Sequence, residues 1–201
     1  IHEKALFGGF PTQDEVTILE DLGVRYFIDL TLFNESKTIP YFTKYRYIKY
    51  PIVDRTIPRD WNSFAQLIVE ICYIISSLKQ DEKVYIHCKG GHGRSGVLVS
   101  CILCHYFNMK PEEALHETNK SHFNRPIMKI KHRTMGSPHR RGQREFVHKF
   151  FRPLLFDKPN EVGFSVGFSN LSRHKVTTDL GTFPNAQLAF QAFRSDNKEY
   201  I

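Results

Sequence analysis

The chain has 201 residues, with 28 Lys or Arg against 21 Asp or Glu, a formal net charge of +7 and a pI near 9.2. Its hydrophobic fraction of 41% can supply a folded core, and no apolar run reaches the length of a membrane span. Four cysteines without a signal peptide argue against a disulfide scaffold and favour a reducing compartment, the cytoplasm or nucleus.

The apolar pattern predicts strands alternating with helices. Thr12 and Glu15 form a capping-box pattern that opens the first helix, and residues 64–78 carry the spacing of a longer amphipathic helix. In chain order we expect a turn at 7–11, a helix at 12–22, strands at 26–30 and 45–52, a helix at 59–79, a strand at 83–87, and helices at 95–107, 111–120 and 142–155. This alternation indicates an α/β fold with a central, mainly parallel sheet flanked by helices.

Residues 87–96, His-Cys-Lys-Gly-Gly-His-Gly-Arg-Ser-Gly, lie between an expected strand and an expected helix. Glycines let consecutive backbone N–H groups turn inward, and the helix dipole adds positive potential, so this loop suits an anion. Cys88 stands at its start, and a cysteine beside a helix N-terminus and cations ionises more readily than a free one. The loop is also at the carboxyl end of a strand, where open α/β sheets bind ligands.

Two further residues of the loop suit phosphoryl transfer. Arg94 offers a planar fork that matches two phosphoryl oxygens. The Ser95 hydroxyl is placed to donate to the cysteine sulfur when the sulfur becomes the leaving group. Together with Cys88, these residues predict phosphate monoester hydrolysis through a phosphocysteine intermediate, without a metal or cofactor.

The stretch matches the pattern H-C-x-x-G-x-x-R-[ST] at His87, Cys88, Gly91, Arg94 and Ser95. It therefore resembles the signature of the cysteine-dependent protein tyrosine phosphatase superfamily, and the short chain is similar to the dual-specificity branch. The resemblance implies a phosphatase domain in which His87 orders the loop through hydrogen bonds. It also implies that phosphate is held by the loop residues Lys89, Gly90, Gly91, His92, Gly93 and Arg94.

The resemblance further implies a general acid and a water-positioning residue. In the family, an Asp on a movable loop upstream of the cysteine protonates the leaving oxygen, and Asp54 follows the expected strand at 45–52. Asp60 is the competitor, but it stands where a carboxylate is expected at a helix N-terminus. Gln143 resembles the glutamine that orients the hydrolytic water in some relatives; the alternative is an ordinary polar residue in the first turn of a helix.

The substrate class stays open at this point. Phosphotyrosine, phosphoserine and phosphothreonine in proteins are the leading prediction, while Lys89 and His92 resemble the basic loop residues of phosphoinositide phosphatases. Basic residues also gather at Lys129, Lys131, Arg133, Arg140, Arg141, Arg144, Lys149 and Arg152. Such a cluster attracts an acidic protein segment, an RNA 5′ end or an anionic membrane, or is one solvated face of a helix and a loop. An RNA 5′-triphosphatase, a phosphoinositide phosphatase and a phosphate-binding pseudophosphatase without turnover are therefore the alternatives.

The catalytic domain is expected to span residues 1–155, followed by a C-terminal extension at 156–201. The sequence Phe-Ser-Asn at 168–170, followed by Phe-Pro at 183–184, resembles the opening of the NADAR family, which is linked to N-glycosidic bonds in ADP-ribose and riboflavin-pathway compounds. Gln187 stands where that family usually has a Glu. The extension is interpreted as a truncated or degenerate fragment, with chance similarity as the alternative.

Overall fold

The computed structural model describes residues 4–126, 128, 130–151, 175–178 and 181–183. The chain divides into two compact units, Ile1–Phe151 and Arg152–Ile201. In the second unit, β5 (Val176–Thr178) and β6 (Gly181–Phe183) form an antiparallel pair. The predicted boundary at residue 155 and the NADAR-like residues 168–170 and Gln187 lie outside the described residues.

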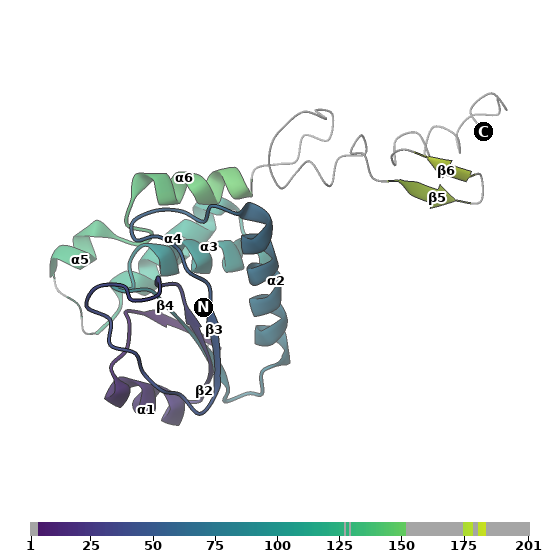
Figure 1. The fold of residues 1–201 in the computed structure, drawn as a ribbon. Coiled ribbons are helices and arrows are strands. Elements are labelled where there is room, and N and C mark those ends of the chain that lie inside the picture. The colour runs from purple at the N-terminus through teal and green to yellow at the C-terminus, as the bar shows by residue number, and fades with distance from the viewer. Residues whose placement is uncertain (1–3, 127, 129, 152–174, 179–180, 184–201) are drawn as a thin grey trace. The chain divides into compact units, whose positions relative to one another are not determined.

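A four-stranded parallel sheet forms the centre of the first unit, in the order β1-β4-β2-β3 (Figure 1). Its strands are β1 (Ala5–Gly8), β2 (Val24–Asp29), β3 (Arg46–Lys49) and β4 (Lys83–His87). Because every pairing is parallel, all four carboxyl ends lie at one edge, where Gly8 and Asp29 both align with His87. Cys88 follows directly at that edge, so the sheet brings the residues after each strand towards the cysteine.

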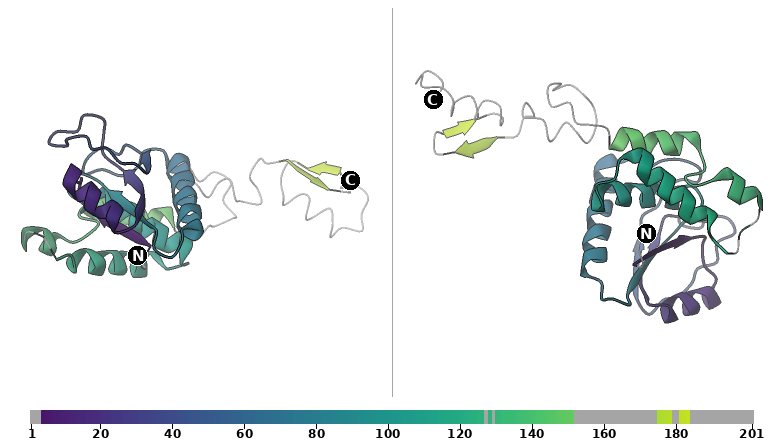
Figure 2. Two further views of the ribbon diagram at one scale, coloured as in Figure 1. Left: turned by 90° about the horizontal axis from the view of Figure 1, so that it is seen from below. Right: turned by 180° about the vertical axis from the view of Figure 1, so that it is seen from behind.

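Helices cover both faces of this sheet (Figures 1 and 2). On one face lies α1 (Gln13–Asp21), against β2. The other layer contains α2 (Trp61–Ser77), α3 (Arg94–Tyr106), α4 (Pro111–Phe123) and α6 (Arg141–Phe150), and the short α5 (Ile130–Met135) connects α4 to α6 along the chain. Helix α3 contacts β1, β4 and the three long helices beside it, so it is the central element of that layer.

Buried side chains anchor the loop between β4 and α3 at both of its ends. The main core lies between the sheet and the helical layer, and Ile86 on β4 and Leu98 and Ile102 on α3 are fully buried in it. A smaller core under α1 contains Val16, Val24, Phe27 and Tyr85. Each such side chain stabilises the fold by about 1.5–3 kcal/mol. The loop after β4 therefore starts from a buried strand and ends in a buried helix.

Most of the predicted elements are present. The capping box is confirmed, since Thr12 Oγ1 accepts from the Glu15 N–H and Glu15 Oε2 accepts from the Thr12 N–H. The long helix starts at Trp61 with Asp60 as its N-cap, and α4 continues past the predicted end to Phe123. Strand β3 is shorter than the predicted 45–52, and α5 was not expected.

The expected turn at residues 7–11 is wrong at its start, because Phe7 and Gly8 belong to strand β1. A four-residue strand is too short to show a period, and the glycine pair that follows it dominates the local pattern. Position 8 requires glycine because a Cβ there would lie 2.2 Å from the Tyr85 hydroxyl oxygen. Among the described residues, no helix is long and apolar enough to cross a membrane.

Gly91, in the loop after β4, lies directly against the backbone of Gly8 at the end of β1. Replacing Gly91 tests this close backbone contact. Its φ is +72°, and a Cβ would lie 2.3 Å from the Gly8 carbonyl carbon. Gly91→Ala is expected to lower the free energy of unfolding by about 3 kcal/mol, through backbone strain and overlap. Chemical denaturation measures it, with Gly142→Ala in α6 as control, since nothing lies within 4 Å of that Cβ. Equal stability of the two variants would contradict the close approach.

Candidate active site

The loop at residues 88–93 connects β4 to α3 and borders a hollow of about 320 Å³, the site hollow. Cys88 lies at its base and is 3% exposed. Its sulfur is 3.5 Å from the Ser95 hydroxyl oxygen in the first turn of α3. Gly93 is the N-cap of α3 and has no side chain to cap the helix, so the first backbone N–H groups are left for an anion.

Arg94 is almost completely buried and is fixed by several acceptors. Its Nη1 and Nη2 atoms donate to the two carboxylate oxygens of Glu35 at 2.7 and 2.8 Å. Nη1 also donates to the carbonyls of Leu30 and Ile52, and Nη2 donates to Asp54 Oδ1 at 2.9 Å. The Nε atom has no hydrogen-bond partner among the described residues. The guanidinium is thus held through both of its Nη atoms, and its Nε–H is the donor that these contacts do not use.

Glu35 is a site residue that the sequence analysis missed. Burial alone would raise the pKa of Glu35, but the hydrogen bonds from Arg94 and from the Leu32 N–H hold that pKa below its ordinary value. The carboxylate is therefore ionised at neutral pH and compensates the buried charge of Arg94. Its loop carries no periodic pattern, and the only available signal was that a buried arginine needs a carboxylate partner.

The two candidate acids lie in different places. Asp54 lines the site hollow and accepts from Arg94, and its side chain is 49% exposed. Asp60 is the N-cap of α2, where its Oδ1 accepts from the Ser63 N–H at 3.0 Å. The geometry therefore brings Asp54, and not Asp60, to the same donor as Glu35.

Gln143 lines the site hollow and is 1% exposed. Its Nε2 donates to the Thr56 carbonyl at 3.0 Å, and its Oε1 accepts from the Arg140 N–H at 3.1 Å. A Cβ on Gly93 would come within 2.9 Å of the Gln143 amide, so this side chain packs directly on the end of the loop. Its position depends on the contact between α6 and the segment after Asp54.

His87 precedes the cysteine and is fully buried at the end of β4. Its Nε2 lies 2.7 Å from the Tyr41 hydroxyl, while Nδ1 is 3.7 Å from Asp29 Oδ1 and has no hydrogen-bond partner among the described residues. Burial lowers the pKa of His87 to about 4, so the imidazole is neutral at physiological pH. It holds the start of the loop by hydrogen bonding.

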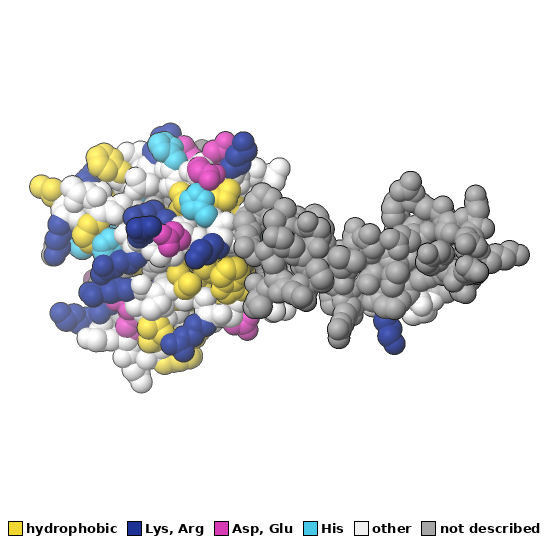
Figure 3. All heavy atoms as spheres, turned by 90° about the horizontal axis from the view of Figure 1, so that it is seen from above, with side chains coloured by type: hydrophobic (Ala, Val, Ile, Leu, Met, Phe, Trp, Pro, Cys, Tyr) yellow, Lys and Arg dark blue, Asp and Glu magenta, His cyan; other side chains and the backbone are white. Residues whose placement is uncertain are grey.

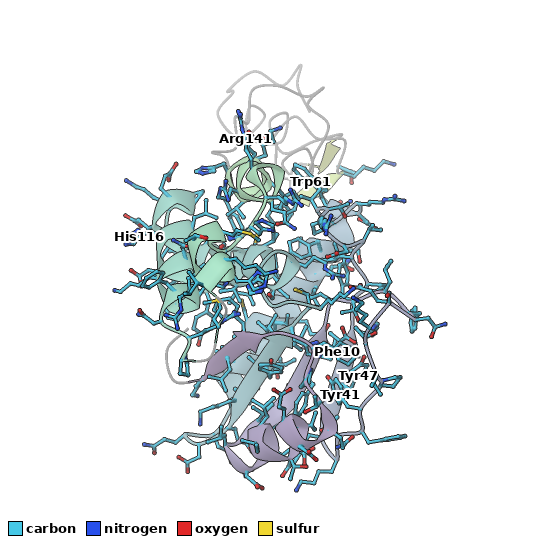
Figure 4. The ribbon with its side chains drawn as sticks, turned by 90° about the vertical axis from the view of Figure 1, so that its left-hand side faces the viewer. Phe10, Tyr41, Tyr47, Trp61, His116 and Arg141 are labelled. Carbon is cyan, nitrogen blue, oxygen red and sulfur yellow. The ribbon has the colours of Figure 1, made fainter. Side chains whose placement is uncertain are left out.

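A network of polar side chains supports His87 from below. Asp29 is completely buried at the end of β2 and accepts hydrogen bonds from Tyr47, Lys49 and Thr31. Burial alone would raise the pKa of Asp29, but His87, Lys49 and Tyr47 hold that pKa below its ordinary value. Figure 4 shows Tyr47 beside Tyr41 and Phe10 at this edge of the strands, where the rings pack edge to face.

Three histidines from separate segments meet beside the loop. His92 Nδ1 lies 2.7 Å from Nε2 of His122, and the His92 ring stacks on His132 with centroids 4.4 Å apart. Burial, and then the neighbouring histidines and Arg125, lower the pKa of His92 to about 3. Burial and the nearby cations also lower the pKa of His122 to about 4. His92 and His122 are therefore neutral, with one ring nitrogen donating to the other.

Basic side chains surround the hollow. Arg55 and Lys89 line it, and Arg140 lines it from the segment before α6. The backbone of Gly90 lines it beside Lys89. Arg141, the next residue of the predicted basic cluster, does not line it: its Nε donates to Glu145, and its side chain is 88% exposed. Lys129 and Arg152 of that cluster lie outside the described residues. Figure 3 shows Lys, Arg and His side chains spread over the face that contains α6.

Residues 5–107 match the family model described as "Tc-R-P: Polymorphic toxin system, DSP-PTPase phosphatase". "Putative tyrosine phosphatase 197R" of Invertebrate iridescent virus 6 is 43% identical over 151 residues, which are 74% of this chain and 51% of that protein. "Phosphatidylglycerophosphate phosphatase PTPMT1" of Arabidopsis thaliana is 33% identical over 118 residues, 57% of this chain and 34% of that protein. The chain thus spans only about half the length of the first of these relatives.

Solved structures share the fold. The crystal structure of Tk-PTP in the active form has a TM-score of 0.55 at 23% identity, and covers 73% of this chain and 90% of that one. PTPMT1 in complex with PI(5)P has a TM-score of 0.55 at 20% identity, and covers 74% of this chain and 90% of that one. At these identities the likeness establishes the architecture alone.

The histidine pair predicts how stability depends on pH. An exposed histidine titrates near 6.5, so unfolding at acid pH lets His92 and His122 bind protons that the folded chain excludes. The folding free energy that depends on keeping these two histidines neutral is fully present above about pH 6.5 and is lost as the pH falls towards 4. Between pH 7 and 4.5, His122→Gln is expected to lose less unfolding free energy than the unmodified chain, by about 1 kcal/mol or more.

Chemical denaturation at the two pH values measures the difference. His116→Gln is the matched control, since His116 is exposed on the same helix (Figure 4). If His116→Gln and His122→Gln changed the pH dependence equally, the pair would have no special role.

Proposed function

The chain belongs to the cysteine-dependent protein tyrosine phosphatase superfamily, in the dual-specificity group, and from this premise we propose that it hydrolyses phosphate monoesters through a phosphocysteine intermediate. One observation carries the proposal. Cys88 and Arg94 border the same hollow, and the rigidly held guanidinium keeps its Nε atom without a partner among the described residues. A nucleophile and a fixed cation are thus ready for one phosphoryl group.

In the first step, the backbone N–H groups of the loop and Arg94 bind the phosphoryl oxygens. The Cys88 thiolate attacks phosphorus, an S–P bond forms, and the bond from phosphorus to the leaving oxygen breaks. Asp54 Oδ1 accepts a hydrogen bond from Arg94 Nη2. A bound phosphoryl group competes for that donor, and the released Asp54 carboxylate takes up a proton from water and passes it to the leaving oxygen.

In the second step, water attacks the phosphocysteine and the S–P bond breaks. Gln143 orients the water through its amide, and Asp54 accepts the proton that the water loses. Ser95, whose hydroxyl oxygen lies 3.5 Å from the sulfur, donates to the departing thiolate. Both steps use side chains, backbone N–H groups and water, and we propose no metal or cofactor.

We propose phosphotyrosine, phosphoserine and phosphothreonine residues of proteins as the substrates. The name of the viral relative reported above, a putative tyrosine phosphatase, supports this class. The charge of the site hollow agrees with it, because the free cations around Cys88 attract a phosphorylated segment. The RNA 5′-triphosphate alternative stays a prediction.

A phosphorylated lipid headgroup is the second candidate. A solved neighbour, PTPMT1, is described in complex with PI(5)P, and the Arabidopsis thaliana relative reported above is named a phosphatidylglycerophosphate phosphatase. The basic residues Lys89 and Arg140 at the hollow agree with an anionic headgroup. Comparing a phosphopeptide with a phosphoinositide at matched salt concentration separates the two candidates.

The general acid is tested by two matched substitutions. Asp54→Asn is expected to lower kcat on a small aryl phosphate by about 10²–10⁴-fold, because the leaving oxygen loses its proton donor. Asp60→Asn is the control, since asparagine is an equally good N-cap for α2 and leaves the site untouched. Cys88→Ser sets the background rate, with a chelator present. If Asp60→Asn lowered kcat and Asp54→Asn left it unchanged, Asp60 would be the general acid and Asp54 would not.

Gln143 is tested by separating the two steps. Gln143→Ala is expected to leave formation of the phosphocysteine largely intact and to slow its hydrolysis about tenfold or more, because the water loses its orienting amide. Stopped-flow measurement should then show a burst of the aryl alcohol followed by slow turnover. If Gln143→Ala lost the burst and the steady-state turnover to the same extent and also had a lower melting temperature, this buried side chain would only support the fold.

A further inference from the structure

We propose that the site hollow contains a second anion subsite, formed by His132, His139 and Arg140, that binds a second phosphate group carried by the same small substrate. This rests on the proposed phosphatase function and develops its second candidate substrate, the phosphorylated headgroup, rather than a phosphorylated protein residue. The substrate is a phosphate monoester on a compact carrier, such as an inositol ring or a sugar, with another phosphate close to the one that is hydrolysed.

The first argument is the surplus of positive charge. Asp54 is the only carboxylate among the described residues that line the hollow, whereas Arg55, Lys89, Arg94 and Arg140 all line it. The charge of Arg94 is compensated by Glu35. Arg55 has only a 3.8 Å contact with Asp54, and Lys89 and Arg140 form no ion pair with a described residue. Arg140 is therefore a lining cation that no described carboxylate pairs with, and it can bind an anionic group besides the phosphoryl group held by Arg94 and the loop.

The second argument is that one side of the hollow is held in place before any ligand binds. Arg144 Nη1 donates to the carbonyls of Pro138 and His139 at 2.8 and 3.1 Å. The Ser137 N–H donates to Asn119 Oδ1 at 3.0 Å. The backbone that carries His139 and Arg140 is therefore anchored at two points, which reduces the entropy lost when a ligand is bound.

The same side carries donors that suit a phosphate. His132 is fixed by its stacking on His92, so its ring is ordered at the edge of the loop that holds Cys88. Burial, followed by the positive charges of Arg140, Arg144 and Arg55, lowers the pKa of His139 below its ordinary value. Positive charge is thus concentrated at this point, where a bound phosphate would relieve it.

The third argument concerns the size and the lining of the hollow. A volume of about 320 Å³ is at the lower end for a ligand pocket and fits one small ring with its phosphates. Among the described lining residues, none is Phe, Tyr or Trp, so a phenyl ring of the substrate would have no such ring to pack against. Two phosphates on neighbouring carbons of one ring are close enough to share this volume.

The substitution Arg140→Gln tests the subsite. It removes the charge and keeps the backbone N–H that donates to Gln143. Arg141→Gln is the matched control, because Arg141 is the next residue and pairs with Glu145 on the outer side of α6 (Figure 4). The probes are an inositol bisphosphate with phosphates on neighbouring carbons, an inositol monophosphate and a small aryl phosphate.

For the unmodified chain, kcat/KM for the bisphosphate is expected to exceed that for the monophosphate by about tenfold or more. Arg140→Gln should reduce this ratio about tenfold, and Arg141→Gln should leave it unchanged. A phosphoinositide bisphosphate in vesicles, compared with the soluble headgroup, distinguishes a lipid from a free polyphosphate as the source of the same chemistry.

The outcomes separate the two proposals. Cys88-dependent hydrolysis of the aryl phosphate with a ratio near one, unaffected by Arg140→Gln, would overturn the subsite and leave the phosphatase function standing. Absence of aryl phosphate hydrolysis would overturn the function, and calorimetric binding of the bisphosphate to the Arg140→Gln and Arg141→Gln variants would still decide the subsite. A doubly phosphorylated peptide that outcompetes the inositol bisphosphate would overturn the choice of a compact carrier.

Discussion

The buried ion pair between Arg94 and Glu35 is the constraint on which the site depends. A charged guanidinium at the start of a buried helix costs several kcal/mol unless a carboxylate and further acceptors compensate it. Glu35 supplies two of those hydrogen bonds, and the carbonyls of Leu30 and Ile52 supply two more. Together they fix the plane of the guanidinium, while Nη2 also donates to Asp54 and Nε has no partner among the described residues. Segments that are distant in the sequence are thereby tied to the first turn of α3.

The parallel sheet supplies the second part of the arrangement. Because all strands end at one edge, the loop after β4 rests on the end of β1, and His87 lies beside the end of β2. Glycine at position 91 lets the backbones of these two segments meet without a side chain between them. The hydrogen bond between His87 and Tyr41 then fixes the strand end from the other side. The loop is preorganised by backbone packing as much as by its own sequence.

The parts of the site that a sequence can reveal are those that lie within one segment. Cys88, Arg94 and Ser95 are close in the chain, so their spacing alone indicates the strand–loop–helix context. Asp54 could be chosen over Asp60 because a carboxylate just before a helix has an obvious structural role. Glu35 could not be found, nor could the pairing of His92 with His122, because these contacts join loops and helices that carry no common pattern. Strand β1 was not predicted for a related reason: the strand that it pairs with, β4, lies far along the chain.

Burial divides the roles of the basic groups around Cys88. His87 precedes Cys88 and His92 lies in the loop after it, and both are kept neutral, since burial lowers the pKa of His87 to about 4 and that of His92 to about 3. The positive potential of this part of the site therefore comes from arginine, lysine and the helix N-terminus, whose charges hardly change between pH 5 and about 8. A phosphate monoester itself gains its second negative charge near a pKa of about 6. The dependence of substrate capture on pH in that range is thus set chiefly by the substrate, and the neutral histidines act by positioning the loop.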